Sequence, residues 1–302
     1  MPTVSIGPKV SGENAAGVDP VRIRFWGVRG SIPTPGPQTV RFGGNTSCVE
    51  VRADGQIIIL DAGSGLRPLG TALSEEFRGR PLELSILITH THWDHIQGFP
   101  FFAPAYQTQN RIRVLGFEEA RRGLQDALAG QMEAPYFPVA LAEMPGSITF
   151  EELHGDSAAI GSVRLSACRS NHPGNCHGYR LDTSAGSICY IPDHEASGDD
   201  TGLKTADAAR LMKNADVVIL DAQYTAEEYC GHAGWGHSSI DDAIHVARNA
   251  RVKRLYMFHH DPAHDDAFLD RMLQRARQIA MGSGMTVESA REGESVTLAA
   301  KA

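Results

Sequence analysis

Cysteine is scarce in this sequence, and long apolar runs are missing from it. The chain has 302 residues but only five cysteines, an odd number with no CxxC spacing. A disulfide framework is therefore not expected, which is typical of a protein in a reducing cytosol. No run approaches the ~20 apolar residues of a membrane span, and the N-terminus lacks the features of a signal peptide. We therefore predict a cytoplasmic protein with no membrane partner.

Positive charge is also in short supply. Lys and Arg number 28 against 36 Asp and Glu, which gives a formal net charge of −8. Proteins that hold a long nucleic acid usually present a basic face, because neutralising phosphates supplies much of the affinity. The charge balance therefore disfavours an extended nucleic acid as the partner.

The order of apolar segments along the chain predicts the architecture. Residues 1–20 show no hydrophobic period and are expected to form a loose N-terminal extension, followed by one domain over residues 21–302. Strands are expected at 21–26, 48–52, 56–60, 84–88, 111–115, 148–153, 163–169, 179–183, 187–191, 217–220, 255–258, 285–289 and 295–298. Helices are expected at 66–77, 118–131, 203–214, 240–249 and 266–281. Strands that first come in runs and then alternate with helices predict an α/β fold, an αββα sandwich of two mixed sheets flanked by helices.

A dense group of polar residues follows the apolar run LSILI at residues 84–88. It reads His90-x-His92-x-Asp94-His95, so that four possible metal ligands fall within six residues. Imidazole nitrogen and carboxylate oxygen are the ligands that zinc and similar divalent metals take. The alternative is a polar loop in which Asp94 caps a helix.

The segment THTHWDH at residues 89–95 resembles the HxHxDH signature of the metallo-β-lactamase superfamily, and further motifs follow in the superfamily's order to the C-terminus. They are Asp61 in LDAG, His172 in SNHP, Asp193 in IPDHE and His259 in LYMFHHDP. The resemblance implies the αββα fold and two divalent metal ions per chain, zinc or alternatively manganese. It assigns the first metal to His90, His92 and His172, the second to Asp94, His95 and His259, and the bridging position to Asp193. Asp61 would support the site, and His260 is the alternative to His259.

Two more segments resemble the tRNase Z branch of that superfamily. They are VVILDAQY at residues 217–224 and the sequence Gly236-His237-Ser238-Ser239. Asp221 stands where the branch usually has Glu. The resemblance gives His237 the role of proton donor to a departing alkoxide, with Asp221 orienting its ring and Asp94 counted among the catalytic residues. The alternative is that His237 only caps a helix.

The segments FWGVRGSIP, GGNTSC and FHHDP resemble the small cyclic-nucleotide phosphodiesterases of the superfamily. Arg29 and Ser31 lie in the glycine-rich loop at residues 27–47 and are expected to border the phosphate, with a plain surface loop as the alternative. Tyr136 and Phe137 are expected to stack on a base, with core packing as the alternative. No long basic arm of the kind used to hold tRNA is evident in the sequence.

The leading hypothesis is a binuclear phosphodiesterase that hydrolyses 3′,5′-cyclic nucleotides or similar small cyclic phosphodiesters. A tRNase Z-type endoribonuclease is the second hypothesis, and a thiolester or lactam hydrolase is the third. A binding module without activity is the fourth, and it would be expected to lack metal ligands. Dimers are common among such relatives, so a homodimer is expected.

Overall fold

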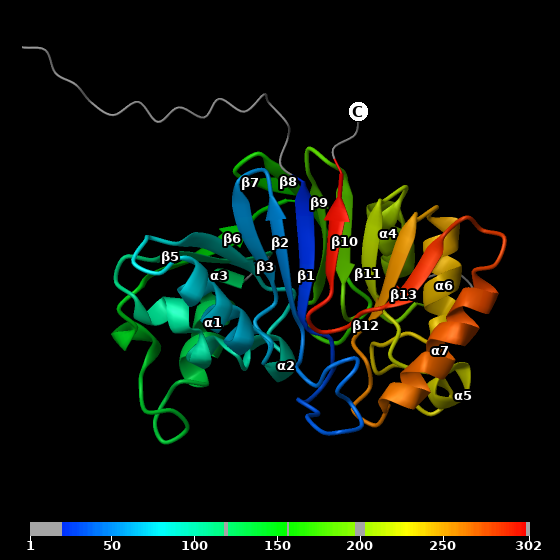
Figure 1. Ribbon diagram of the computed structural model, residues 1–302, viewed down its shortest axis with the longest axis horizontal. Helices are drawn as coiled ribbons and strands as arrows, with labels where there is room; N and C mark the ends of the chain where they lie inside the picture. The colour runs from blue at the N-terminus through cyan, green and yellow to red at the C-terminus, as the bar shows by residue number, and fades with distance from the viewer. Residues whose placement is uncertain (1–19, 118–119, 156, 197–202, 300–302) are drawn as a thin grey trace, which may run out of the picture.

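The computed structural model describes residues 20–117, 120–155, 157–196 and 203–299. The predicted N-terminal extension lies, apart from Pro20, outside the described residues. Two seven-stranded sheets pack face to face, with helices on both outer faces (Figure 1). The predicted αββα sandwich of two mixed sheets is therefore confirmed.

The first sheet is built mainly from the N-terminal half of the chain. Its order is β14-β1-β2-β3-β4-β5-β6, and the strands from β3 to β6 run parallel. The strands are β1 (Val21–Gly27), β2 (Cys48–Ala53), β3 (Gln56–Leu60), β4 (Glu83–Leu87), β5 (Arg111–Phe117), β6 (Ser147–Leu153) and β14 (Ser295–Leu298).

The second sheet is built from the C-terminal half. Its order is β13-β12-β11-β10-β9-β8-β7, and the strands from β10 to β13 run parallel. The strands are β7 (Ser157–Ile160), β8 (Val163–Arg169), β9 (His177–Asp182), β10 (Ser187–Ile191), β11 (Val217–Asp221), β12 (Arg254–Phe258) and β13 (Thr286–Ser289).

The helices cover the two outer faces. Those beside the first sheet are α1 (Leu66–Glu76) and α3 (Ala120–Gly130), and those beside the second are α4 (Leu203–Met212), α6 (Ile240–Asn249) and α7 (Asp266–Ile279) (Figure 1). Two further helices of one turn each are α2 (Trp93–Ile96) and α5 (Ala226–Tyr229). Within the described residues, no helix is long and apolar enough to cross a membrane.

The hydrophobic core follows from the period of the strand sequences. In β1 the side chains of Val21, Ile23 and Phe25 are fully buried between the sheets, while those between them face outward. The central strand β11 is buried along its whole length, as expected for a parallel strand covered on both faces.

The structure differs from the predicted elements in a few short segments. Strand β7 and helices α2 and α5 were not predicted, because four residues are too few to show a period. Helix α7 ends at Ile279, two residues earlier than predicted, and Gly282 follows with a φ of +78°. Residues 118 and 119 of the helix predicted over 118–131 lie outside the described residues.

The parallel strands bring several loops to one edge of the sandwich. Strands β3, β4, β10, β11 and β12 all end at this edge, which is the lower one in Figure 1, where α2 lies. The polar residues that follow these strands are therefore placed close together.

Candidate metal centre

Buried strand β4 leads directly into the first group of candidate ligands. His90 and His92 lie in the loop after the strand, and α2 begins at Trp93. Asp94 and His95 therefore lie in the first turn of this helix, where both are buried. An extended loop followed at once by a helical turn allows four neighbouring side chains to face one point.

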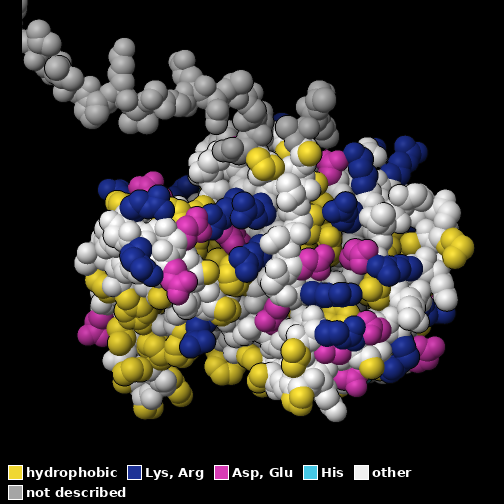
Figure 2. Space-filling view, in the orientation of Figure 1, with side chains coloured by type: hydrophobic (Ala, Val, Ile, Leu, Met, Phe, Trp, Pro, Cys, Tyr) yellow, Lys and Arg dark blue, Asp and Glu magenta, His cyan; other side chains and the backbone are white. Residues whose placement is uncertain are grey.

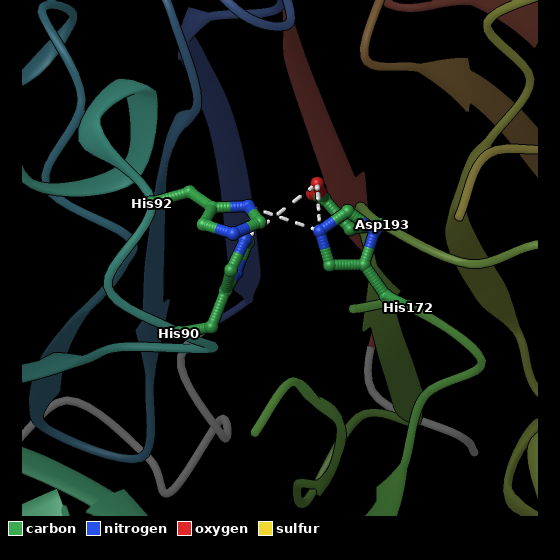
Figure 3. Close-up of side chains that lie close together, drawn as sticks. All are labelled: His90, His92, His172 and Asp193. Atoms are coloured by element: carbon green, nitrogen blue, oxygen red, sulfur yellow. Dashed lines mark hydrogen bonds and ion pairs between the residues drawn. The ribbon is translucent and has the colours of Figure 1, made fainter. Parts of the chain in front are cut away.

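His172 and Asp193 of the second sheet complete a first cluster with His90 and His92 (Figure 3). His172 Nε2 lies 3.0 Å from His92 Nδ1 and 3.7 Å from Asp193 Oδ2. His90 Nε2 lies 3.8 Å from the same carboxylate oxygen. One ligand atom from each of the four residues lies within 4.8 Å of the others, so the group could hold one metal ion.

A second cluster joins Asp94 and His95 to His259, which follows β12. Asp94 Oδ2 lies 3.1 Å from His259 Nε2 and 3.3 Å from His95 Nε2. Asp193 touches this cluster as well, with Oδ1 3.1 Å from His95 Nε2 and Oδ2 3.5 Å from His259 Nε2. Asp193 thus lies between the two clusters, which is the position that a bridging carboxylate requires.

The two adjacent histidines after β12 point in different directions. His259 has a φ of +61° and faces the second cluster. His260 Nε2 instead lies 3.0 Å from the carbonyl oxygen of Ala290 and 3.2 Å from Ser289 Oγ. The structure therefore brings His259, and not its neighbour, to the other candidate ligands.

Unpartnered buried atoms show that the clusters suit a cation. His90 Nε2 is buried without a hydrogen bond among the described residues, and His95 Nε2 and Asp193 Oδ1 are buried with only ion-pair contacts, of which the one to each other measures 3.1 Å. Buried polar atoms without a partner are costly, and a metal ion between them would supply the missing interaction. The donors are nitrogen and oxygen atoms only, a set that zinc accepts and that also suits manganese.

The charge states also favour metal binding. Burial lowers the pKa of His90, His92 and His172, so these rings are neutral and keep a lone pair for a metal. Burial opposes ionisation of Asp193, but its electrostatic interactions with His259 and His95 hold its pKa well below the usual value. Burial likewise opposes a charge on His95, and yet the carboxylates around it, Asp193 first among them, raise its pKa. The cluster thus favours positive charge at its centre.

Four of the five candidate ligand histidines, all except His92, have their Nδ1 occupied by an outer partner. Such outer partners fix the tautomer and the orientation of a ligand ring. The pairs are His95 Nδ1 with Asp61 Oδ2 at 2.8 Å, His90 Nδ1 with Thr89 Oγ1 at 3.1 Å, His172 Nδ1 with the Gly236 carbonyl at 3.0 Å, and His259 Nδ1 with Gln223 Oε1 at 3.0 Å. The sequence pointed to Asp61 but not to Gln223, because a glutamine two residues beyond a strand carries no signal of its own.

Asp61 is itself held from several sides. It is fully buried, and its carboxylate accepts hydrogen bonds from the backbone N–H of Thr89 at 2.8 Å and from the Tyr190 hydroxyl at 2.9 Å. Its carboxylate lies against His95 Nδ1, and its role in supporting a metal site stays a prediction.

His237 and Asp221 form a buried pair beside both clusters. His237 Nδ1 lies 2.7 Å from Asp221 Oδ2, its ring stacks on His259 at 4.8 Å, and it meets the edge of His172 at 5.0 Å. Burial opposes a charge on this ring, but the negative charge of Asp221 and its hydrogen bond raise the pKa of His237 to about 9. The pair can therefore hold a proton next to the candidate metal ions.

The N-terminus of α6 is capped by Ser239 rather than by His237. The Ser239 hydroxyl accepts a hydrogen bond from the backbone N–H of Asp242 at 3.1 Å. The alternative in which His237 serves as a helix cap therefore finds no support in the geometry.

The four predicted substrate-binding residues are placed differently from one another. Arg29 is fully buried, and its guanidinium donates to the carbonyl oxygens of Gly43, Asp261 and His264 at 2.8, 2.9 and 2.6 Å. Its guanidinium joins two loops and has no described hydrogen bond to the clusters, so the sequence-based expectation for this side chain needs correction. Ser31, two residues further on, contacts the second cluster, because its backbone N–H donates to Asp94 Oδ2 at 2.8 Å.

Tyr136 and Phe137 lie on a different segment. Tyr136 is 81% exposed, whereas Phe137 packs edge-on against Phe101 with ring centres 5.4 Å apart. No described ring contact or hydrogen bond joins either side chain to the two clusters. Their role in base stacking stays a prediction.

Other exposed apolar residues are next to site residues in the chain. Trp93 is 64% exposed between His92 and Asp94, and Trp235 is 61% exposed two residues before His237. Ile32, which follows Ser31, is 55% exposed. Exposed large apolar side chains that gather at one place often mark a binding surface, and the sequence alone could not show which tryptophans remain exposed.

Known proteins share this sequence pattern and this arrangement of sheets. The model of the family described as "Beta-lactamase superfamily domain" matches residues 57–260. Ribonuclease Z of Thermoplasma acidophilum is 25% identical over 300 residues, an alignment that covers 85% of this chain and 91% of that protein.

Solved structures show the same fold. The metallo-beta-lactamase fold protein YhfI from Bacillus subtilis has a TM-score of 0.69 at 17% identity, over 92% of this chain and 99% of its own. The short form of human tRNase Z has a TM-score of 0.62 at 19% identity, over 92% of this chain and 99% of its own.

Proposed function

Because this chain belongs to the metallo-β-lactamase superfamily, in its ribonuclease Z-like branch, we propose that it is a metal-dependent phosphodiesterase with two metal ions. Its proposed substrates are 3′,5′-cyclic nucleotides or similar small cyclic phosphodiesters. The observation that carries the proposal is the buried His237–Asp221 pair, 2.7 Å apart, beside two clusters that share Asp193. A proton donor in addition to the metals accelerates cleavage of a phosphodiester with a poor alkoxide leaving group, typically by about 10²–10⁴-fold.

The proposed ligands divide between the two clusters. His90, His92 and His172 would hold one metal, Asp94, His95 and His259 would hold the other, and Asp193 would contact both. Two divalent cations at such a site supply an activated water nucleophile and neutralise charge on the phosphoryl oxygens.

The remaining steps fall to side chains of the chain itself. Asp221 occupies Nδ1 of His237, which leaves Nε2 to give a proton to the departing 3′ oxygen. The carboxylate of Asp221 stabilises the protonated ring before the transfer. The backbone N–H of Ser31 fixes one oxygen of Asp94 and so restricts how this ligand can turn.

The charge of the molecule supports a small substrate. The formal net charge is −8, and on the face seen in Figure 2 the described basic and acidic side chains are mixed rather than gathered in a basic band. A long polyanion is held mainly through phosphate contacts with such bands. Trp93 and Trp235 offer aromatic faces on which a single base could stack.

The second candidate is cleavage of precursor tRNA, because the named relatives are ribonucleases Z. A thiolester or lactam hydrolase is less well supported, since it has no need of the His237–Asp221 pair that lies against His259 and His172. A binding module without activity was expected to lack ligands, and all seven candidate ligands are present.

One comparison of substrates tests the proposal. Metal-replete protein should hydrolyse a cyclic mononucleotide faster than it cleaves precursor tRNA at the same protein concentration. Efficient cleavage of precursor tRNA with every cyclic nucleotide left intact would instead establish the second candidate. We further propose that the chain forms a homodimer, which light scattering of the purified protein would test.

A further inference from the structure

Glu195 lies two residues after Asp193, and its side chain belongs to neither of the two clusters of candidate ligands. Its half-buried carboxylate accepts three hydrogen bonds. Oε1 accepts from the Tyr229 hydroxyl and from the backbone N–H of Gly234, both at 2.7 Å. Oε2 accepts from the backbone N–H of Gly236 at 2.9 Å. A single side chain thus fixes both ends of the short segment 234–236.

This segment controls two residues of the site. The carbonyl oxygen of Gly236 lies 3.0 Å from His172 Nδ1, and the next residue in the chain is His237. Gly236 has a φ of +90°, and a Cβ there would lie 2.4 Å from His172 Nδ1. The segment therefore presses closely on His172, and a small shift of Gly236 would turn the rings of both histidines.

The backbone of Glu195 reaches the other side of His172. Its N–H donates to the Asn171 carbonyl at 2.9 Å, and its own carbonyl accepts from Asn171 Nδ2 at 2.8 Å. Glu195 therefore holds Asn171, the residue before His172. It also holds the segment 234–236, whose Gly236 carbonyl lies against His172 Nδ1.

From these contacts we propose that Glu195 is a positioning residue, which sets His172 as a metal ligand and His237 as the proton donor through the segment 234–236. The inference rests on the proposed two-metal phosphodiesterase. Glu195 itself touches neither the candidate metal positions nor the substrate, so its effect would pass through Gly236.

The three donors explain why the residue is a carboxylate. Two of them are backbone N–H groups, which can only donate. A glutamine offers one acceptor oxygen and one NH2 group, so at least one of the N–H groups of Gly234 and Gly236 would face another donor. Glu195→Gln therefore keeps the shape of the side chain but releases one end of the segment.

Glu228→Gln is the matched control. Glu228 is also a partly buried carboxylate that accepts from a backbone N–H, that of Thr225 at 2.8 Å, and its other oxygen lies 2.9 Å from His264 Nε2. Its carboxylate forms no described contact with the segment 234–236. The two variants therefore lose the same charge in the same region of the molecule.

Two measurements on zinc-loaded protein decide the question. The first is retention of zinc against increasing chelator. Because loss of outer-shell partners typically weakens metal binding 10- to 100-fold, Glu195→Gln should lose zinc at about tenfold lower chelator, and Glu228→Gln should match the wild type. The second compares kcat and KM for a cyclic nucleotide and for bis(4-nitrophenyl) phosphate. Glu195→Gln should lower kcat about tenfold on the cyclic nucleotide, with a smaller loss on the nitrophenyl ester and little change in KM.

The outcomes separate the possible roles. If Glu195→Gln only lowers the melting temperature, while zinc retention and both kcat values equal those of the control, the inference is wrong. If the wild type hydrolyses no phosphodiester, the proposed function fails, but zinc retention still tests Glu195. Should Glu195→Gln not fold, Glu195→Asp replaces it, since this variant keeps the charge and is one methylene too short to reach both glycines. Full zinc retention in Glu195→Asp would equally overturn the inference.

Discussion

Replacing His237 by alanine separates proton donation from metal binding. The ring contacts Asp221 at 2.7 Å and stacks on His259 at 4.8 Å. If His237 protonates the leaving oxygen, its loss should cost the 10²–10⁴-fold that general acid catalysis typically supplies. At 1.36 kcal/mol for each factor of ten, this equals about 3–5 kcal/mol of barrier. The loss should appear on a cyclic nucleotide, whose leaving group is an alkoxide.

The contrast with a second substrate makes the test specific. The leaving group of bis(4-nitrophenyl) phosphate is stable as an anion and needs no proton. His237→Ala should therefore reduce kcat on this substrate much less than on the cyclic nucleotide. Asp221→Asn should give a milder form of the same pattern, because it keeps a hydrogen-bond partner and removes the charge that stabilises the protonated ring.

The structure also defines the competing explanation. His237 can be grouped with Asp193 and His259 as three residues able to hold a metal. If His237 were a ligand, His237→Ala would contain less metal and would lose activity on both substrates alike. Elemental analysis after removal of free metal, together with kcat on both substrates, distinguishes the two roles. Equal losses on the two substrates would refute the reasoning, whether or not metal is lost.

The pH dependence should follow the same pair. Although burial opposes protonation, Asp221 raises the pKa of His237 to about 9, so the ring should stay protonated through neutral pH. Activity on the cyclic nucleotide should then fall at alkaline pH, where His237 loses its proton. In Asp221→Asn the alkaline fall should begin at lower pH, and a profile identical to that of the wild type would contradict this role for Asp221.

Four further predictions concern the ligands, the rim, the core and the surface. Asp193→Ala, which removes the carboxylate between the two clusters, should reduce the metal content measured by elemental analysis from about two ions per chain to one or fewer. Trp93→Ala should raise KM for a cyclic nucleotide about fivefold with little change in kcat, the effect of losing ~1 kcal/mol of base stacking; an unchanged KM would remove Trp93 from substrate binding. Phe25→Ala empties a fully buried position whose ring centre lies 5.1 and 6.4 Å from those of two other aromatic rings. Urea unfolding should therefore show a loss of about 3–5 kcal/mol in the free energy of unfolding. A loss below ~1 kcal/mol would mean that the core closes over the space. Burial opposes ionisation of Asp216, but its bonds to Lys253 and Ser187 lower its pKa to about 2, so the ionised form stabilises the fold above the unfolded-state pKa of about 3.9. The difference in free energy of unfolding between wild type and Asp216→Asn should therefore shrink as the pH falls from about 4 to about 2.

Local sequence patterns predicted much of this molecule. The runs of apolar residues in β4 and β11 identified buried parallel strands, because their burial is nearly continuous. The candidate ligands follow such strands directly, so a spacing such as His90-x-His92 was enough to suggest a common target. Where the chemistry depends on a few adjacent residues, the sequence contains the necessary information.

Tertiary contacts account for what could not be predicted. Arg29 looked like a phosphate-binding residue of a glycine-rich loop, yet three carbonyl oxygens from two distant loops surround its guanidinium. Gln223 and Glu195 act through partners 36 and 41 residues away in the chain, His259 and Gly236. No local period or spacing reports such pairings.

Two strands far apart in the sequence, β1 and β14, pair at one side of the first sheet. Val21 of β1 is paired with Leu298 of β14, and Arg24 with Ser295. Until β14 is available, β1 is the outer strand of its sheet, with unpaired backbone groups along one side. During synthesis β1 leaves the ribosome well before β14, which lies more than 260 residues later in the sequence. Since contacts between residues so distant in sequence form slowly, a nascent chain is exposed to wrong strand pairing along β1 until β14 has emerged.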